Sequence, residues 1–261
     1  EDKPKAISLA LVGGLVAAIL GPEISYRLIG VVDGALYTGC FIGAALVQCL
    51  ALPILLGMPK LAVAAGINRG RSMSAFLRLP AFRLALCSAA LGYAVMSFLM
   101  TAAPLQIVNV SLLGEALNAR VIQWHVIAMF APSFFTGSLI SRFGIRSIMS
   151  AGLVLYLASI IMALSGLQFW YYFATLFFVG LGWNFLYIAG TSLITLVAEP
   201  EERGRVQGIT DMTVFTAVAC ASLSAGIIHT IGGWQVMIFV ALLPISIIGL
   251  GIVMTRANSL P

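Results

Sequence analysis

Polar side chains within long apolar segments are the residues of this sequence best suited to chemistry. One segment places four small or polar residues on a single helical face, with an indole beside it: Gly180, Asn184, Tyr187 and Thr191, flanked by Trp183. Because amide, phenol and indole groups hydrogen-bond and stack, this face predicts one wall of a cavity for an organic solute. For Asn184, a hydrogen bond to a neighbouring helix is an equally good interpretation. For Gly180 and Thr191, packing between helices is the better interpretation.

Two other segments carry candidate contacts for a solute. His125 and Met129 share a face, and Tyr93, Met96 and Met100 share another. An imidazole titrates near neutral pH, so His125 predicts a proton or substrate relay. The alternative is a histidine that water satisfies at a membrane boundary. Methionine and aromatic side chains adapt to varied apolar ligands, although such stripes more often pack against neighbouring helices.

One carboxylate lies close to several bases. Asp211 follows Arg203 and Arg205 near the start of an apolar segment. We expect it to pair with them or with Arg142 and Arg146, which would hold one conformation closed. Proton coupling through Asp211 is the alternative.

Side-chain sets typical of catalysis are not found. The two histidines lie on separate segments without partners at metal-ligand spacing, and no Gly-rich phosphate loop ends in Gly-Lys-Ser or Gly-Lys-Thr. No Ser-His-acid group follows from spacing. We therefore expect no catalytic residue, no metal, no cofactor and no enzyme.

The composition indicates where these residues lie. Of 261 residues, 61% are hydrophobic and only 9% are charged, whereas soluble domains carry about 25% charged residues. So few charges cannot cover the surface of a soluble protein of this size, which predicts an all-α polytopic membrane protein with lipids as partners. The net charge of +5 fits basic cytoplasmic loops and requires no nucleic acid.

Charge-free stretches predict eight transmembrane helices, because about 20 apolar residues cross a bilayer. Pro132 predicts a kink in the fourth helix, and Gly232-Gly233 predicts the break between the last two. The expected spans are Ala6–Tyr26, Gly34–Met58, Leu84–Leu113, Val121–Ser141, Ser147–Gly166, Phe169–Ala198, Gly208–Thr230 and Gly233–Met254.

The bases predict the orientation. With the N-terminus in the cytoplasm, all Lys and Arg residues except Arg27 and Arg120 fall on the cytoplasmic side. This asymmetry follows the positive-inside rule and places both termini in the cytoplasm. Glu23, near the outer end of the first span, is expected to pair with Arg27.

Residues 137–146, Gly-Ser-Leu-Ile-Ser-Arg-Phe-Gly-Ile-Arg, join the fourth and fifth spans. This stretch resembles the loop motif of the major facilitator superfamily, with Ser141 in place of the usual Asp and Ile145 in place of a base. Such departures fit the copy in the second half of that family. The matching residues are Gly137, Leu139, Arg142, Phe143, Gly144 and Arg146.

Two further stretches carry the resemblance. Gly21-Pro22 is similar to a Gly-Pro motif in the fifth helix of that family's exporters, and residues 180–187 and 199–208 are similar to the tenth helix and the loop after it. The resemblance implies that the eight spans are helices five to twelve of a twelve-helix carrier whose first four helices are missing. Residues 1–58 would be the last two helices of the N-terminal bundle, 59–83 the central cytoplasmic loop and 84–261 the six-helix C-terminal bundle.

The resemblance also implies a function. We expect a secondary carrier in the cytoplasmic membrane that moves a small organic solute by alternating access, coupled to protons or another ion. Export of a drug-like compound and uptake of a metabolite or vitamin such as riboflavin both remain open. The alternative is a membrane scaffold or regulatory subunit that transports nothing.

Overall fold

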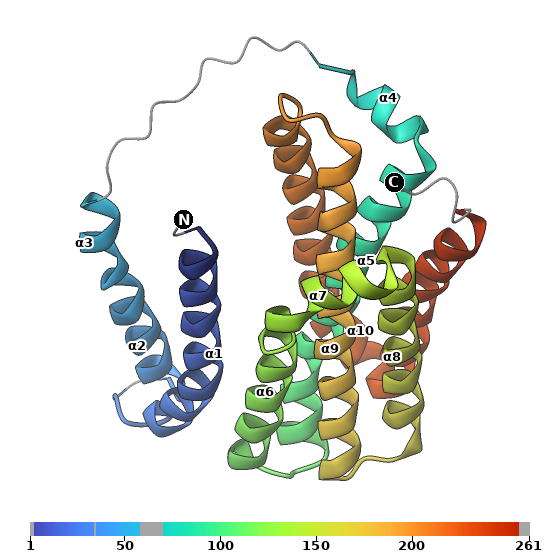
Figure 1. Ribbon diagram of the computed structural model, residues 1–261. Coiled ribbons are helices and arrows are strands. Elements are labelled where there is room, and N and C mark those ends of the chain that lie inside the picture. The colour runs from blue at the N-terminus through green and yellow to red at the C-terminus, as the bar shows by residue number, and fades with distance from the viewer. Residues whose placement is uncertain (1–2, 34, 58–69, 256–261) are drawn as a thin grey trace.

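The computed structural model describes residues 3–33, 35–57 and 70–255. Every regular element within these ranges is a helix, which agrees with the all-α expectation (Figure 1). Residues Lys60 and Arg69 of the expected central loop lie outside the described ranges. The elements are α1 (Lys3–Leu28), α2 (Thr38–Cys49), α3 (Ala51–Leu56), α4 (Met73–Arg78), α5 (Pro80–Pro104), the π-helix η1 (Leu105–Val110), α6 (Glu115–Phe130), α7 (Ser133–Phe143), α8 (Ile145–Ser165), α9 (Phe169–Val197) and α10 (Arg203–Met254).

Four of the described helices are long and apolar enough to cross a membrane. They are α5 continued through η1, then α8, α9 and α10, and the bent pair α6 and α7 makes a fifth if it forms one span. The helix α1 covers the first expected span, while α2 and α3 are shorter and lie inside the second.

Two breaks occur where the sequence predicts them. Ala131 and Pro132 separate α6 from α7, and the two helices meet at a bend of 43°. The 52-residue α10 is interrupted at Gly233, whose φ of 68° and ψ of −171° are not helical. A positive φ is accessible to glycine at little cost because it has no Cβ, so this residue allows the chain to reverse.

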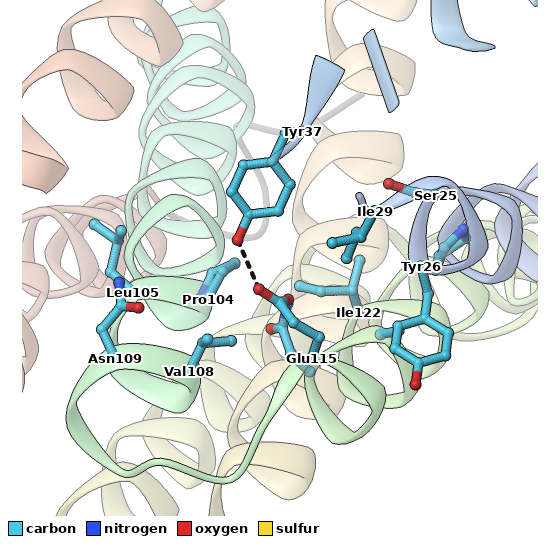
Figure 2. A pocket seen from close by; sticks show the side chains of 13 residues that line it. Ser25, Tyr26, Ile29, Tyr37, Pro104, Leu105, Val108, Asn109, Glu115 and Ile122 are labelled. Atoms are coloured by element: carbon cyan, nitrogen blue, oxygen red, sulfur yellow. Dashed lines mark hydrogen bonds between the residues drawn. The ribbon is translucent and has the colours of Figure 1, made fainter. Parts of the chain in front are cut away.

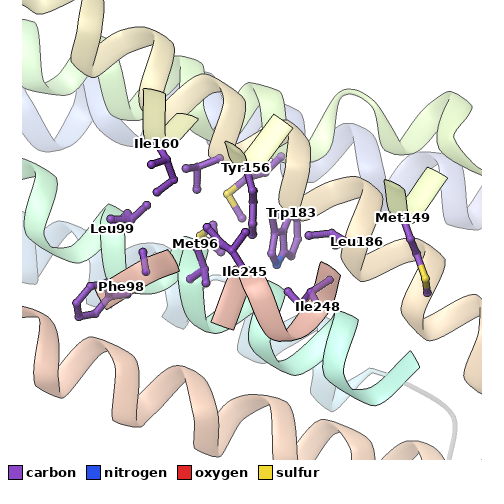
Figure 3. Packing of buried hydrophobic residues seen from close by; sticks show 14 of the residues in the cluster. Met96, Phe98, Leu99, Met149, Tyr156, Ile160, Trp183, Leu186, Ile245 and Ile248 are labelled. Carbon is purple, nitrogen blue, oxygen red and sulfur yellow. The ribbon is translucent and has the colours of Figure 1, made fainter. Parts of the chain in front are cut away.

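The hydrophobic core lies between α5, α8, α9 and α10. Figure 3 shows its middle, where Met96, Tyr156 and Trp183 approach Ile245 and Ile248. Small residues bring α8 and α9 together, because a Cβ on Gly152 would lie 3.0 Å from the carbonyl oxygen of Gly182. These contacts hold α9, which carries Trp183, Asn184 and Tyr187 of the candidate site, in the centre of the bundle.

The first helices form a separate pair beside this bundle (Figure 1). The helix α1 packs against α6, with fewer contacts to α7, and α2 packs against α1. The expected ion pair forms on α1, where Arg27 Nε lies 2.8 Å from Glu23 Oε1.

Candidate functional site

Three of the predicted site residues meet in one aromatic cluster. The rings of Trp183 and Tyr187 on α9 stack, with centroids 5.1 Å apart and planes at 11°. Tyr93 on α5 meets them edge-on, with centroids 5.0 Å from Trp183 and 5.5 Å from Tyr187. Phe130, at the end of α6, and Phe215 on α10 extend the cluster at 6.1 Å from Trp183 and 6.2 Å from Tyr93. Four helices thus bring aromatic surface to one place.

The cluster holds one buried hydrogen-bond donor that has no partner among the described residues. Trp183 is 6% exposed, and its indole Nε1 is buried without a partner among the described residues. An unpaired buried donor costs free energy, and an acceptor on a bound molecule would recover that cost. Phe215 is exposed, so the cluster reaches the surface on the α10 side. The cluster therefore combines planar apolar surface with one directed polar contact.

Asn184 joins α9 to the bend between α6 and α7. Its Nδ2 donates to the carbonyl oxygen of Met129 and to Ser133 Oγ, each at 2.6 Å, and its Oδ1 accepts from Thr136 Oγ1 at 2.7 Å. The side chain is fully buried. Of the two interpretations given to Asn184, these contacts favour the bond between helices. Thr191, also on α9, donates only within its own helix.

We predict that Asn184→Ala destabilises the protein by about 1–3 kcal/mol, because it leaves buried groups at the bend without a partner. The thermal melting temperature in detergent should fall, and the dissociation constant of any bound solute should change little. Thr191→Ala is the matched control on the same helix. A substituted protein with an unchanged melting temperature and weakened solute binding would instead place Asn184 in the solute contact.

His125 is enclosed between α6 and α9. Its Nδ1 donates to the carbonyl oxygen of Leu176 at 2.7 Å, while its Nε2 is buried without a described partner. A Cβ on Gly180 would come within 2.6 Å of the His125 carbonyl oxygen, so the two helices touch here. This environment is one of helix packing and not the water-accessible boundary considered for His125.

The predicted methionines do not share one environment. Met96 and Met129 are buried in the hydrophobic core, whereas Met100 packs partly buried at its edge. The same face of α5 is tied to α10 by a hydrogen bond of 2.7 Å between Ser97 Oγ and Ser222 Oγ. Packing therefore accounts for the methionine stripe in this conformation.

Among the described residues, Asp211 forms none of the expected ion pairs in this conformation. Its carboxylate instead accepts a hydrogen bond of 2.9 Å from Gln207 Nε2, one turn earlier on α10. Arg142 lies over the ring of its neighbour Phe143, 5.2 Å from the centroid, and Arg146 forms no ion pair within the described ranges. Asp211 also lies one turn before Phe215, which places it next to the aromatic cluster.

An ion pair that the sequence did not reveal joins Arg71, just before α4, to Glu202 in the α9–α10 connection, with the carboxylate buried and the arginine side chain 40% exposed. Glu202 accepts from the backbone N–H of Arg71 at 2.6 Å and from its guanidinium at 2.7 Å. Arg71 also donates to the carbonyl oxygen of Val197 at 2.8 Å and lies over the ring of Phe76. These hydrogen bonds lower the pKa of Glu202 from 4.5 to about 2. A depressed pKa means that the stabilisation is complete above the ordinary value and is lost as the pH falls towards 2, so the pair persists at physiological pH.

A cavity of about 290 Å³ is lined by residues of α1, by Tyr37 and by residues of α5, η1 and α6. Figure 2 shows that Tyr37 reaches across it, and its hydroxyl donates to Glu115 Oε1 at 2.6 Å. Gln123 makes a second link by donating to the carbonyl oxygen of Ile19 at 2.7 Å. These two hydrogen bonds connect the first helix pair to α6 alongside the packing of α1 on α6.

The motif glycines have different surroundings. Gly144 joins α7 to α8 with a φ of 82°, a conformation that favours glycine. A Cβ on Gly137 or on Gly21 would meet no atom of the described residues within 4 Å. Among these three glycines, only Gly144 has a backbone conformation or a close contact within the described ranges that requires glycine.

Long apolar helices packed through glycines, with few charges, define an integral membrane protein of the polytopic helical class. The sequence pattern of the Major Facilitator Superfamily matches residues 86–259. The chain belongs to this superfamily, a family of transporters, which confirms the resemblance inferred from the loop motif and the expectation that it is not an enzyme.

Curated relatives extend the match. The chain is 42% identical to the riboflavin transporter RfnT of Brucella anthropi over 241 residues, which are 90% of this chain and 60% of the relative. It is 35% and 29% identical to YdeG and YddS of Bacillus subtilis, both uncharacterized MFS-type transporters, over 51% of this chain and 31% of each relative. The chain thus spans less than two thirds of the length of these relatives.

Proposed function

We propose that the protein is a secondary active carrier for riboflavin or a similar planar heterocycle, acting in uptake across the cytoplasmic membrane. The observation that carries this proposal is the aromatic cluster of Tyr93, Trp183 and Tyr187 with the unpaired indole N–H of Trp183. A flavin ring offers a flat π-face for stacking and carbonyl oxygens for that donor. The 42% identity to a riboflavin transporter supports the same substrate class.

In this proposal the eight predicted spans are helices five to twelve of a twelve-helix carrier, and both termini are cytoplasmic. Residues 1–58 belong to the N-terminal bundle and residues 84–261 to the C-terminal bundle. Solute binds between the bundles at the aromatic cluster, and their rocking exposes it to either side. Asp211, next to the cluster, is the candidate carboxylate for proton coupling, whereas the enclosed His125 has a positioning role.

The test is solute uptake into proteoliposomes that contain the protein. We expect riboflavin to accumulate when a proton gradient is imposed and the accumulation to collapse with a protonophore. Excess lumichrome, which presents a flat ring system without the ribityl chain, should compete, and ribitol should not. Uptake no faster than in protein-free vesicles, with gradients imposed in either direction, would refute the proposed function. Competition by ribitol alone would refute recognition through the ring.

A further inference from the structure

A groove outside the aromatic cluster runs between α5 and the second half of α10, with a volume of about 380 Å³. Its α5 wall consists of Pro80, Arg83, Leu84 and Cys87, which share one helical face. Its other wall consists of Ile247, Leu250, Gly251 and Met254 on α10 and of Thr255 directly after it. Both walls follow helical periodicity, so the groove is a feature of two packed helices and not of a loop.

The groove is polar at one end and apolar along its length. Pro80 and Arg83 begin α5, and Thr255 follows the end of α10, so these residues lie at the same end. Below them the walls are formed by Leu84, Leu250 and other apolar side chains. The two helices approach each other closely at Gly251, where a Cβ would lie 3.3 Å from Leu84 Cδ1.

Arg83 is exposed and has no carboxylate partner within the described ranges, where the ion pairs are Glu23–Arg27 and Arg71–Glu202. The groove lining contains no acidic residue. An uncompensated guanidinium above an apolar channel matches a phosphate with an attached hydrocarbon chain. On a lipid-facing surface at the end where basic residues collect, that combination is supplied by the membrane itself.

We propose that this groove binds one anionic phospholipid of the cytoplasmic leaflet, with its phosphate on Arg83 and an acyl chain between α5 and α10. The apolar strip of α10 supports the acyl-chain site, since Leu250 is 61% exposed and nothing described covers it. Anionic lipids are attracted to basic residues at this leaflet, whereas zwitterionic lipids are not. The proposal does not depend on which solute the protein carries.

The test measures retained lipid by native mass spectrometry of the protein extracted from vesicles of phosphatidylglycerol or phosphatidylcholine. We expect one phosphatidylglycerol to be retained in preference to phosphatidylcholine, and Arg83→Gln to weaken its binding by roughly fivefold. Arg120→Gln, which removes an exposed arginine from the start of another helix, is the charge-matched control. Leu250→Trp should displace the lipid by filling the groove, whereas Leu243→Trp, on the same face but outside it, should not.

A local readout uses Cys87 as the only thiol, with the other three cysteines changed to serine. Bound phosphatidylglycerol should slow its labelling by a maleimide, and soluble glycerol phosphate should not. Equal retention of both lipids, an unchanged result with Arg83→Gln, or equal protection by glycerol phosphate would overturn the proposal. A dimer that Leu250→Trp dissociates would assign the groove to a second copy of the chain and would also overturn it.

Discussion

Replacing Trp183 with phenylalanine is expected to weaken riboflavin binding about five- to tenfold while the protein stays folded. The phenyl ring keeps an aromatic surface beside Tyr187 and Tyr93, but the indole N–H is lost. One hydrogen bond to a ligand is worth about 1–1.5 kcal/mol, which corresponds to that factor. Because the N–H has no described partner in the protein, its removal leaves no group unsatisfied. Titration calorimetry on the purified protein measures the dissociation constant.

Trp183→Ala should have a larger effect, because it also removes the stacking surface. Stacking of a planar base on an aromatic side chain is worth about 1–3 kcal/mol, or roughly ten- to a hundredfold in affinity. Trp170→Phe is the control, since Trp170 is 71% exposed at the start of α9 and lies outside the cluster. An unchanged dissociation constant in Trp183→Phe, or an equal loss in Trp170→Phe, would remove Trp183 from the binding site.

Gly180→Ala is expected to destabilise the bundle by about 1–3 kcal/mol, as overpacked cores do. The new Cβ would stand 2.6 Å from the carbonyl oxygen of His125 and 3.2 Å from Ala128 Cβ. The carbonyl oxygen of His125 belongs to the backbone, so the clash can be relieved only if α6 and α9 move apart. That movement would strain the hydrogen bonds of Asn184, which lies one turn further along α9. A lower melting temperature and a lower yield of folded protein would follow.

Gly226→Ala is the matched control for this substitution. Gly226 lies inside α10, and a Cβ there meets nothing within 4 Å. Alanine is the better helix former by about 1 kcal/mol, so this variant should be as stable as the parent or more so. Equal losses in both variants would mean that glycine at these positions matters for reasons other than the α6–α9 contact.

Much of the helical architecture could be predicted because its signals are local. Pro132 and Gly233 mark the two breaks, and each acts through its own backbone restrictions. The sequence also placed Trp183 beside the helical face that carries Tyr187, although not the stacking of their rings. Tyr93 was also predicted to contact the solute, but its contact with Trp183 and Tyr187 was not predicted. No local sequence pattern shows how α5 packs against α9.

The contacts that sequence reasoning missed or left open depend on which helices pack together and on which of several nearby partners a side chain meets. Arg71 and Glu202 are separated by 131 positions, and neither stands out beside the other charged residues around it. Asp211 was matched to bases by proximity in sequence, yet a helical neighbour, Gln207, satisfies it. Asn184 could be recognised as a group needing a partner, but whether that partner was a solute or the α6–α7 bend depended on tertiary structure.

The Arg71–Glu202 contact determines where the chain can be divided into two separately expressed pieces. A cut anywhere between residues 72 and 83 would leave Glu202 in the second piece without its guanidinium. A cut after Phe76 would also remove from that piece a ring that is fully buried in its core. An isolated carboxylate in such a place disfavours the folded state. A chain that is to reassemble from two pieces should therefore be cut before Gly70, so that Arg71 and α4 stay in the same piece as Glu202.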